Sequence, residues 1–215
     1  MIKCVIFDCD GTMFDTEKLA KKAYEDFASA HDVVLDQEFW GGICGTGYEY
    51  AKPQLERYPV IAENLSKIAA NRLHNITQGA LFAKDNLVKK GLYELLDYCK
   101  ANQIKVAIAS SSHLEYVTML LNHMSKPYEF DFILCGDMIT HKKPDPEIFN
   151  TVVEKLGVKP EETLVLEDSI MGLIAAKRAN TIAGFIEDCV IKNEKIEELL
   201  DVEFPDFTFV PQYLR

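Results

Sequence analysis

Short apolar runs recur along the chain, and each is followed by a longer segment with helical periodicity. The runs are nearly continuous in apolar residues and do not alternate with polar ones, so they predict strands that are covered on both faces. Alternation of such strands with helices is typical of a parallel, doubly wound α/β sheet. The predicted strands comprise residues 3–8, 104–110, 130–136, 163–168 and 182–188.

Two of the intervening helices carry clear end signals. Residues 146–156 place Ile148, Phe149, Val152, Val153 and Leu156 on one stripe, as a helix against a sheet requires. Gly157 follows directly and is suited to the left-handed conformation that ends a helix. The small-residue-rich helix after residue 169 is expected to end in the same way at Asn180.

One region breaks the alternation. Between residues 17 and 80 no comparable strand is found, whereas residues 17–33 and 62–76 have apolar positions at helical spacing. The pattern predicts a small helical domain inserted after the first strand. We expect an α/β core of residues 1–16 plus 81–215 and an inserted helical domain of residues 17–80.

Composition narrows the class of partner. The chain has 215 residues and a formal net charge of −11, which argues against a nucleic-acid or anionic-membrane partner because both need basic surface. No apolar run approaches the roughly 20 residues that span a bilayer. The 6 cysteines lack paired spacing and are interpreted as reduced thiols of a cytoplasmic protein. We also expect the protein to be a monomer.

Polar side chains stand where the predicted strands end. "IFDCDGT" (6–12) ends the first strand with Asp8 and Asp10, a later strand ends with Ser110, and another ends with Glu167 and Asp168. The carboxyl ends of parallel strands meet at one edge of a doubly wound sheet, where ligands bind. Lys143 follows the strand at 130–136 and adds a cation. The sequence therefore predicts one site that contains carboxylates, a hydroxyl and an ammonium group.

Such a set of groups suits phosphoryl transfer. Carboxylate oxygens favour Mg²⁺, which also screens the charge of an incoming phosphate. Asp8 is then the candidate nucleophile and Asp10 the candidate acid and base. Ser110 and Lys143 would hold the transferred phosphoryl group. Backbone N–H groups of the turn at Gly11 and Thr12, together with Ser111, would assist, although Ser111 and Ser112 could alternatively cap the following helix.

The chain resembles the haloacid dehalogenase superfamily, in the subgroup with a helical cap inserted after the first motif. The resemblance is carried by "DCDGT" (8–12), Ser110 in "AIASSS", Lys143 in "KKPDPEIF" and "LEDSIMGLIAAKRA" (166–179), in this order over nearly the whole chain. It implies Asp8 as nucleophile, Asp10 as acid and base with a backbone carbonyl on Mg²⁺, Asp168 as a metal ligand and Glu167 as a metal or metal-water partner. A second aspartate in this motif implies phosphoryl transfer and not dehalogenation.

Two activities remain open within that superfamily. β-Phosphoglucomutases resemble this chain, but they grip a second phosphate with cap cations where it has Cys44 and Tyr48, and they have a histidine near Ala20. We therefore expect hydrolysis of a small, sugar-derived monophosphate, with a mutase as the alternative; Lys52 and Arg57 are the remaining candidates for gripping a second phosphate. The loop with Gly45 is expected to close over the substrate.

Two other classes rank lower. A phospho-accepting receiver domain also joins acidic residues, a hydroxyl and a lysine around Mg²⁺, but such domains lack an inserted cap and accept phosphate on a middle strand. An inactive binding protein on the same scaffold would have no physical reason to keep clustered carboxylates, which repel one another. We therefore predict an enzyme.

Overall fold

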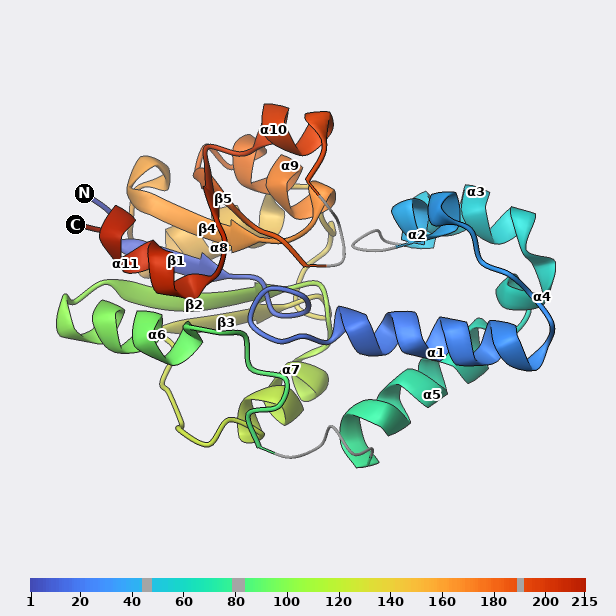
Figure 1. The fold of residues 1–215 in the computed structure, drawn as a ribbon. Helices are drawn as coiled ribbons and strands as arrows, with labels where there is room; N and C mark the ends of the chain where they lie inside the picture. The colour runs from blue at the N-terminus through green and yellow to red at the C-terminus, as the bar shows by residue number, and fades with distance from the viewer. Residues whose placement is uncertain (44–47, 79–83, 189–191) are drawn as a thin grey trace.

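The computed structural model describes residues 1–43, 48–78, 84–188 and 192–215 (Figure 1). Within these residues, six parallel strands form one sheet in the order β3-β2-β1-β4-β5-β6. The order runs in opposite directions on the two sides of β1, as in doubly wound folds, and this confirms the predicted fold class. The strands are β1 (Cys4–Phe7), β2 (Lys105–Ser110), β3 (Phe132–Cys135), β4 (Thr163–Glu167), β5 (Ile182–Ile186) and β6 (Val202–Phe204).

The register of β1 places the predicted polar residues side by side. Phe7, the last residue of β1, lies opposite Ile108 of β2 and Leu166 of β4. The residues that follow these positions are therefore at one edge of the sheet. Asp8, Ser110 and Glu167 lie within two residues of this line, so the fold brings them together although they are distant in the chain.

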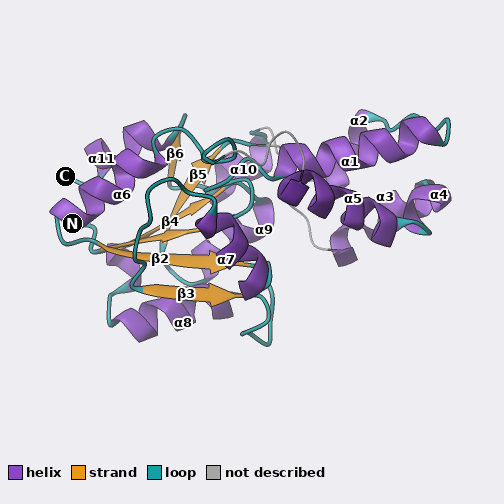
Figure 2. Ribbon diagram, turned by 90° about the horizontal axis from the view of Figure 1, so that it is seen from below, coloured by secondary structure: helices purple, strands orange, loops and turns teal. Residues whose placement is uncertain are grey.

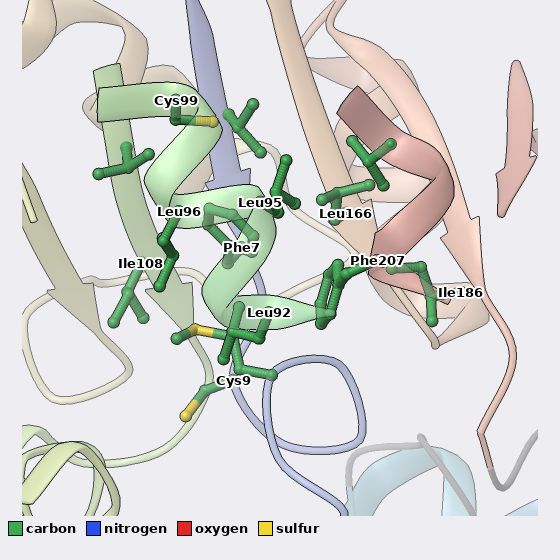
Figure 3. Packing of buried hydrophobic residues seen from close by; sticks show 14 of the residues in the cluster. Phe7, Cys9, Leu92, Leu95, Leu96, Cys99, Ile108, Leu166, Ile186 and Phe207 are labelled. Carbon is green, nitrogen blue, oxygen red and sulfur yellow. The ribbon is translucent and has the colours of Figure 1, made fainter. Parts of the chain in front are cut away.

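Helices cover both faces of the sheet (Figure 2). Val5 and Phe7 pack into one apolar cluster with Leu95 of α6, whereas Ile6 packs into a second cluster with Phe149 of α8; Figure 3 shows the first cluster. Burial on both faces explains why the strand sequences are continuously apolar. The core helices are α6 (Leu92–Ala101), α7 (Leu114–Asn122), α8 (Glu147–Leu156), α9 (Ile170–Arg178), α10 (Glu194–Leu199) and α11 (Val210–Tyr213).

Residues 17–78 form a helical insertion that projects from the carboxyl edge of the sheet (Figures 1 and 2). Its own apolar cluster contains Ala23, Phe39 and Ile61, which are fully buried, and Tyr24, Trp40 and Tyr58 contact the ring of Phe39 edge-on. None of the helices that the structure describes is long and apolar enough to cross a membrane. The insertion contains α1 (Glu17–Ala30), α2 (Gln37–Ile43), α3 (Tyr48–Arg57), α4 (Pro59–Ala62) and α5 (Leu65–Gln78).

The two chain segments that join the insertion to the core run beside each other. Phe14 and Val88 form an isolated antiparallel bridge, and the N–H of Lys89 donates to the carbonyl of Met13 at 3.0 Å. The Lys89 ammonium group also bridges Asp15 at 2.9 Å and Asp188 at 2.5 Å. The outgoing segment, the returning segment and the loop after β5 are thereby held together.

Candidate active site

Lys143 links two of the predicted carboxylates. Its ammonium group donates to Asp8 and to Glu167 at 2.6 Å each, and to the carbonyl of Ala109 at 2.9 Å. The Glu167 carboxylate is held from its other side because Ser169 Oγ donates to it at 2.9 Å. Ser169 is also the N-cap of α9, where its Oγ accepts from the N–H of Gly172. The start of a helix therefore fixes the position of a site carboxylate.

Asp168 completes the carboxylate group. Thr12 Oγ1 donates to it at 3.1 Å, and Gly11, which has a φ of +76°, brings the backbone of the turn against its Oδ2. Oxygens of Asp8, Glu167 and Asp168 lie within 4.8 Å of one another, and all three residues are buried. The structure therefore brings together the residues that the strand ends predict.

The electrostatics of this group favour a bound cation. Burial raises the pKa of Asp8 to about 8; Lys143 opposes this shift, and Glu167 adds to it. Burial, followed by repulsion from Glu167 and Asp8, raises the pKa of Asp168 well above its usual value. Although burial opposes the charge of Lys143, the two carboxylates raise its pKa. Lys143 contacts two of these three buried carboxylates, Asp8 and Glu167. A divalent cation on the carboxylate oxygens would relieve the remaining repulsion.

The serines after β2 separate into different positions. Ser110 is buried, and its Oγ accepts from the N–H of Ser112 at 3.1 Å. Ser111 is exposed. Ser112 Oγ donates to Asp10 Oδ2 at 2.6 Å, whereas the N-cap of α7 is His113 without a side-chain cap. The alternative that Ser111 or Ser112 caps α7 is therefore wrong, because the N-cap position falls one residue later.

Asp10 lies apart from the three carboxylates and accepts from four side chains. Thr16 and Tyr116 donate to its Oδ1 at 2.6 and 2.9 Å, and Arg72 of α5 donates to the same oxygen at 3.1 Å, while Ser112 holds Oδ2. Burial, followed by the Asp10 charge, raises the pKa of Tyr116, so this phenol is a hydrogen-bond donor at neutral pH. Asp10 is thus oriented by donors from the core and from the helical insertion.

Arg72 and Glu17 bring the insertion into the site. The Arg72 guanidinium lies 3.4 Å from Glu17 and over the ring of Tyr116. Burial raises the pKa of Glu17, and Arg72 counteracts that shift. Sequence reasoning missed Arg72, Glu17 and Tyr116 because charged and aromatic residues on helices are more often surface or core positions.

The remaining predicted residues are placed as follows. Gly45 and Cys44 lie outside the described residues. Arg57 pairs with Asp36 at 2.5 Å and with Glu38 at 3.1 Å, and Lys52 is exposed. Within the part of the chain that the structure describes, neither cation forms an ion pair with a carboxylate of the site.

Comparison with known proteins places this geometry in a family. The haloacid dehalogenase-like hydrolase family matches residues 5–185 of the chain, which include every residue of the site described above. The chain belongs to this family. It is a phosphatase of the haloacid dehalogenase type, and this assignment separates it from receiver-type signalling domains.

Two relatives and one solved protein illustrate the similarity. The putative phosphatase YhcW of Bacillus subtilis is 31% identical over 208 residues, covering 94% of this chain and 89% of the relative. The phosphorylated carbohydrates phosphatase of Thermotoga maritima is 32% identical over 183 residues, covering 83% and 82%. CbbY from Rhodobacter sphaeroides in complex with phosphate is 26% identical, with a TM-score of 0.74 and coverage of 98% and 96%. A CbbY variant was also solved with xylulose-(1,5)bisphosphate, at 27% identity and a TM-score of 0.73, covering 97% and 96%.

Proposed function

We propose that this protein is a Mg²⁺-dependent phosphomonoester hydrolase that acts on a small phosphorylated carbohydrate through an aspartyl phosphate on Asp8. The observation that carries the proposal is the buried contact of Lys143 with both Asp8 and Glu167 at 2.6 Å, beside Asp168. It supplies a nucleophile, a cation for phosphate and carboxylates for a metal within one small volume.

Asp8 is proposed as the nucleophile. One of its carboxylate oxygens forms a bond to phosphorus while the bond from phosphorus to the oxygen of the substrate alcohol breaks. Lys143, 2.6 Å from Asp8 Oδ1, is placed to neutralise phosphate oxygens as their charge changes. Ser110 and the backbone N–H of Thr12 are proposed to hold the same oxygens, with Ser111 at the rim. The N–H of Gly11, expected to assist them, instead donates to the carbonyl of Phe14 at 2.8 Å.

Mg²⁺ fits the donor set because Asp8, Glu167 and Asp168 offer buried oxygens within 4.8 Å of one another, and Asp10 is proposed to add its backbone carbonyl. When bound, the cation neutralises charge on the phosphoryl group and orients it. Thr12 and Gly11 keep the Asp168 carboxylate in position, and Lys143 with Ser169 keeps the Glu167 carboxylate in position.

Asp10 is proposed as the acid and base. It protonates the departing alkoxide in the first step and accepts a proton from the water that then attacks the aspartyl phosphate, so that inorganic phosphate is released. Its four donors, of which Tyr116 and Ser112 come from the α7 side of the core, fix the orientation of its carboxylate, which is not part of the cluster of Asp8, Glu167 and Asp168. The two aspartates of the opening motif thus have separate tasks.

The substrate class follows from the relatives and from the insertion. A relative at 32% identity is named as a phosphatase of phosphorylated carbohydrates, and CbbY was solved with phosphate. We propose that α1–α5 act as a cap over the carboxyl edge of the sheet, because Arg72 of α5 reaches Asp10. A mutase would need a grip on a second phosphate, whereas Arg57 pairs with Asp36 and Glu38 and Lys52 is exposed.

The test is the release of inorganic phosphate from a panel of sugar monophosphates, with Mg²⁺ or with EDTA, by wild type, Asp8→Asn and the exposed control Asp97→Asn. We expect release by wild type and by Asp97→Asn only in the presence of Mg²⁺, and no release by Asp8→Asn. Acid-quenched samples of the wild type should carry a phosphoryl group on the peptide that contains Asp8. Interconversion of glucose phosphates without phosphate release would favour the mutase, and turnover by Asp8→Asn equal to wild type would remove Asp8 from the mechanism.

A further inference from the structure

The helical insertion presents one cation to the acid and base carboxylate. Arg72 reaches Asp10 at 3.1 Å, whereas Arg57 is turned to Asp36 and Glu38 and Lys52 is exposed. The segments at 44–47, 79–83 and 189–191, which the structure leaves undescribed, contain no lysine, arginine or histidine. They therefore contribute no further positive side chain.

The charge of Arg72 is already balanced. Its guanidinium contacts Asp10 at 3.1 Å and Glu17 at 3.4 Å, so two carboxylates face one cation. Their side chains are only 16% and 17% exposed, which limits screening by water. A second phosphate or a carboxylate on the substrate would meet excess negative charge at this position.

A recess of about 280 Å³ continues from Arg72 into the insertion. Glu17 at the start of α1 pairs with Arg72 in the middle of α5. Residues one and two turns further along these two helices line the recess, namely Ala20, Tyr24, Leu65 and Ala69. Ile43 of α2 and Ile68 contribute further apolar lining. Ala69 is exposed, so the recess is open on this side, one helical turn from the residue that contacts Asp10.

We propose that this recess receives the leaving group of the substrate, and that this group is uncharged and partly apolar, as in a deoxygenated sugar or another alcohol with few hydroxyls. The inference rests on the proposed hydrolase function, because it takes the departing alcohol to lie beside Asp10. Phosphomonoesters that carry a second anionic group are excluded by Asp10 and Glu17. The recess discriminates by size and the carboxylate pair by charge.

The test fills the recess without changing a charged residue. Ala69→Leu places three further carbons in the recess, and Ala70→Leu makes the same change at an exposed neighbouring position that does not line it. Both proteins and wild type are assayed with acetyl phosphate, phenyl phosphate, 2-deoxyglucose 6-phosphate, fructose 6-phosphate and fructose 1,6-bisphosphate. Each substrate is compared between proteins, so intrinsic differences in leaving-group reactivity cancel.

We expect Ala69→Leu to lower kcat/KM at least about tenfold for phenyl phosphate and 2-deoxyglucose 6-phosphate, since a steric misfit of a few carbons is worth this much. Acetyl phosphate, whose leaving group is small, should change less than about twofold, and Ala70→Leu should match wild type throughout. Wild type should prefer fructose 6-phosphate over the bisphosphate.

Three outcomes oppose the proposal. An equal decrease for every substrate in Ala69→Leu, or none, would remove the recess from substrate binding. A preference of wild type for fructose 1,6-bisphosphate would overturn the charge argument, and CbbY shows that the fold admits such a ligand. Failure of wild type to hydrolyse any of these compounds, acetyl phosphate included, would instead refute the proposed function and the inference with it.

Discussion

The α-carbon of Gly11 lies so close to the carboxylate of Asp168 that a side chain at Gly11 would collide with Oδ2. Gly11 also has a φ of +76°, which other residues rarely adopt. We predict that Gly11→Ala displaces Asp168 and lowers kcat at least about tenfold, because a displacement of this kind disturbs the reacting geometry. The Mg²⁺ concentration needed for half-maximal phosphate release should rise as well.

Gly157→Ala is the matched control for this substitution. Gly157 ends α8 with a φ of +63°, but no atom lies within 4 Å of an added side chain. It should lose about 1 kcal/mol of unfolding free energy from backbone strain, with unchanged kcat. If Gly11→Ala behaved in the same way as Gly157→Ala, contact between the turn and Asp168 would have no role in activity.

The Mg²⁺-free protein should lose stability as the pH rises. Burial raises the pKa of Asp8 from 3.8 to about 8, so between these values the unfolded chain has released a proton that the folded protein retains. The unfolding free energy therefore falls with rising pH across this window. Asp8→Asn has no titrating carboxyl group at this position, so its Tm should depend less on pH in EDTA than the Tm of wild type.

Mg²⁺ should restore the stability that the protein loses at high pH, where the carboxylates are ionised. We expect the increase in Tm on adding Mg²⁺ to be larger at about pH 8 than at about pH 6, since protons compete with the cation for the same oxygens. Thermal unfolding at both pH values, with Mg²⁺ or EDTA, measures this. An increase that is independent of pH would contradict the raised pKa of Asp8.

Tyr116→Phe should reduce kcat and leave KM nearly unchanged. The phenol donates to Asp10 Oδ1 at 2.9 Å, and a hydrogen bond to a charged group contributes about 1.5–3 kcal/mol. Part of that energy orients Asp10, so we expect a decrease in kcat of about tenfold. Tyr213→Phe, at a position that is 41% exposed, serves as control; equal values for the two variants would show that Tyr116 does not position Asp10.

Lys89→Met should destabilise the fold strongly. Lys89 pairs with Asp188, whose side chain is only 1% exposed and has one oxygen without a hydrogen-bond partner. Burial raises the pKa of Asp188, and Lys89 counteracts that shift. Removal of one member of a buried pair costs about 3 kcal/mol, which chemical denaturation would measure.

The neighbouring residue provides the comparison. Lys90 is 76% exposed and pairs with Asp206, so Lys90→Met should cost less than about 1 kcal/mol. The double variant Lys89→Met with Asp188→Asn should recover most of the lost stability, because no uncompensated charge then remains in the interior. An equal decrease in unfolding free energy for Lys89→Met and Lys90→Met would show that the Lys89–Asp188 pair contributes no more than a surface ion pair.

The part of the site on the sheet could be predicted because it depends on strand ends. Asp8, Ser110 and Glu167 each follow or close a continuous apolar run, and the doubly wound topology brings such positions to one edge. Asp168 was found in the same way, whereas Lys143 was assigned from the loop that follows the predicted strand at 130–136. All five predicted strands are present, and each begins and ends within two residues of the predicted positions.

The part on the helical insertion could not be predicted. Glu17 and Arg72 lie 55 positions apart, and on their own helices both fit an ordinary solvated face. Tyr116 follows the expected pattern of a helix packed on a sheet. The short strand Val202–Phe204 was also missed, because three residues at the sheet's edge carry no measurable periodicity.

The bridge between Phe14 and Val88 has a consequence for how this enzyme can change. Both ends of the insertion leave the core at that one point, and the described elements between them are the helices α1–α5, none of which contributes a strand to the sheet. Selectivity could therefore change while most of the chemistry is kept. A different helical unit grafted onto the same pair of positions would bring new alcohols to the unaltered carboxylate centre, if it again supplied a donor for Asp10 in place of Arg72.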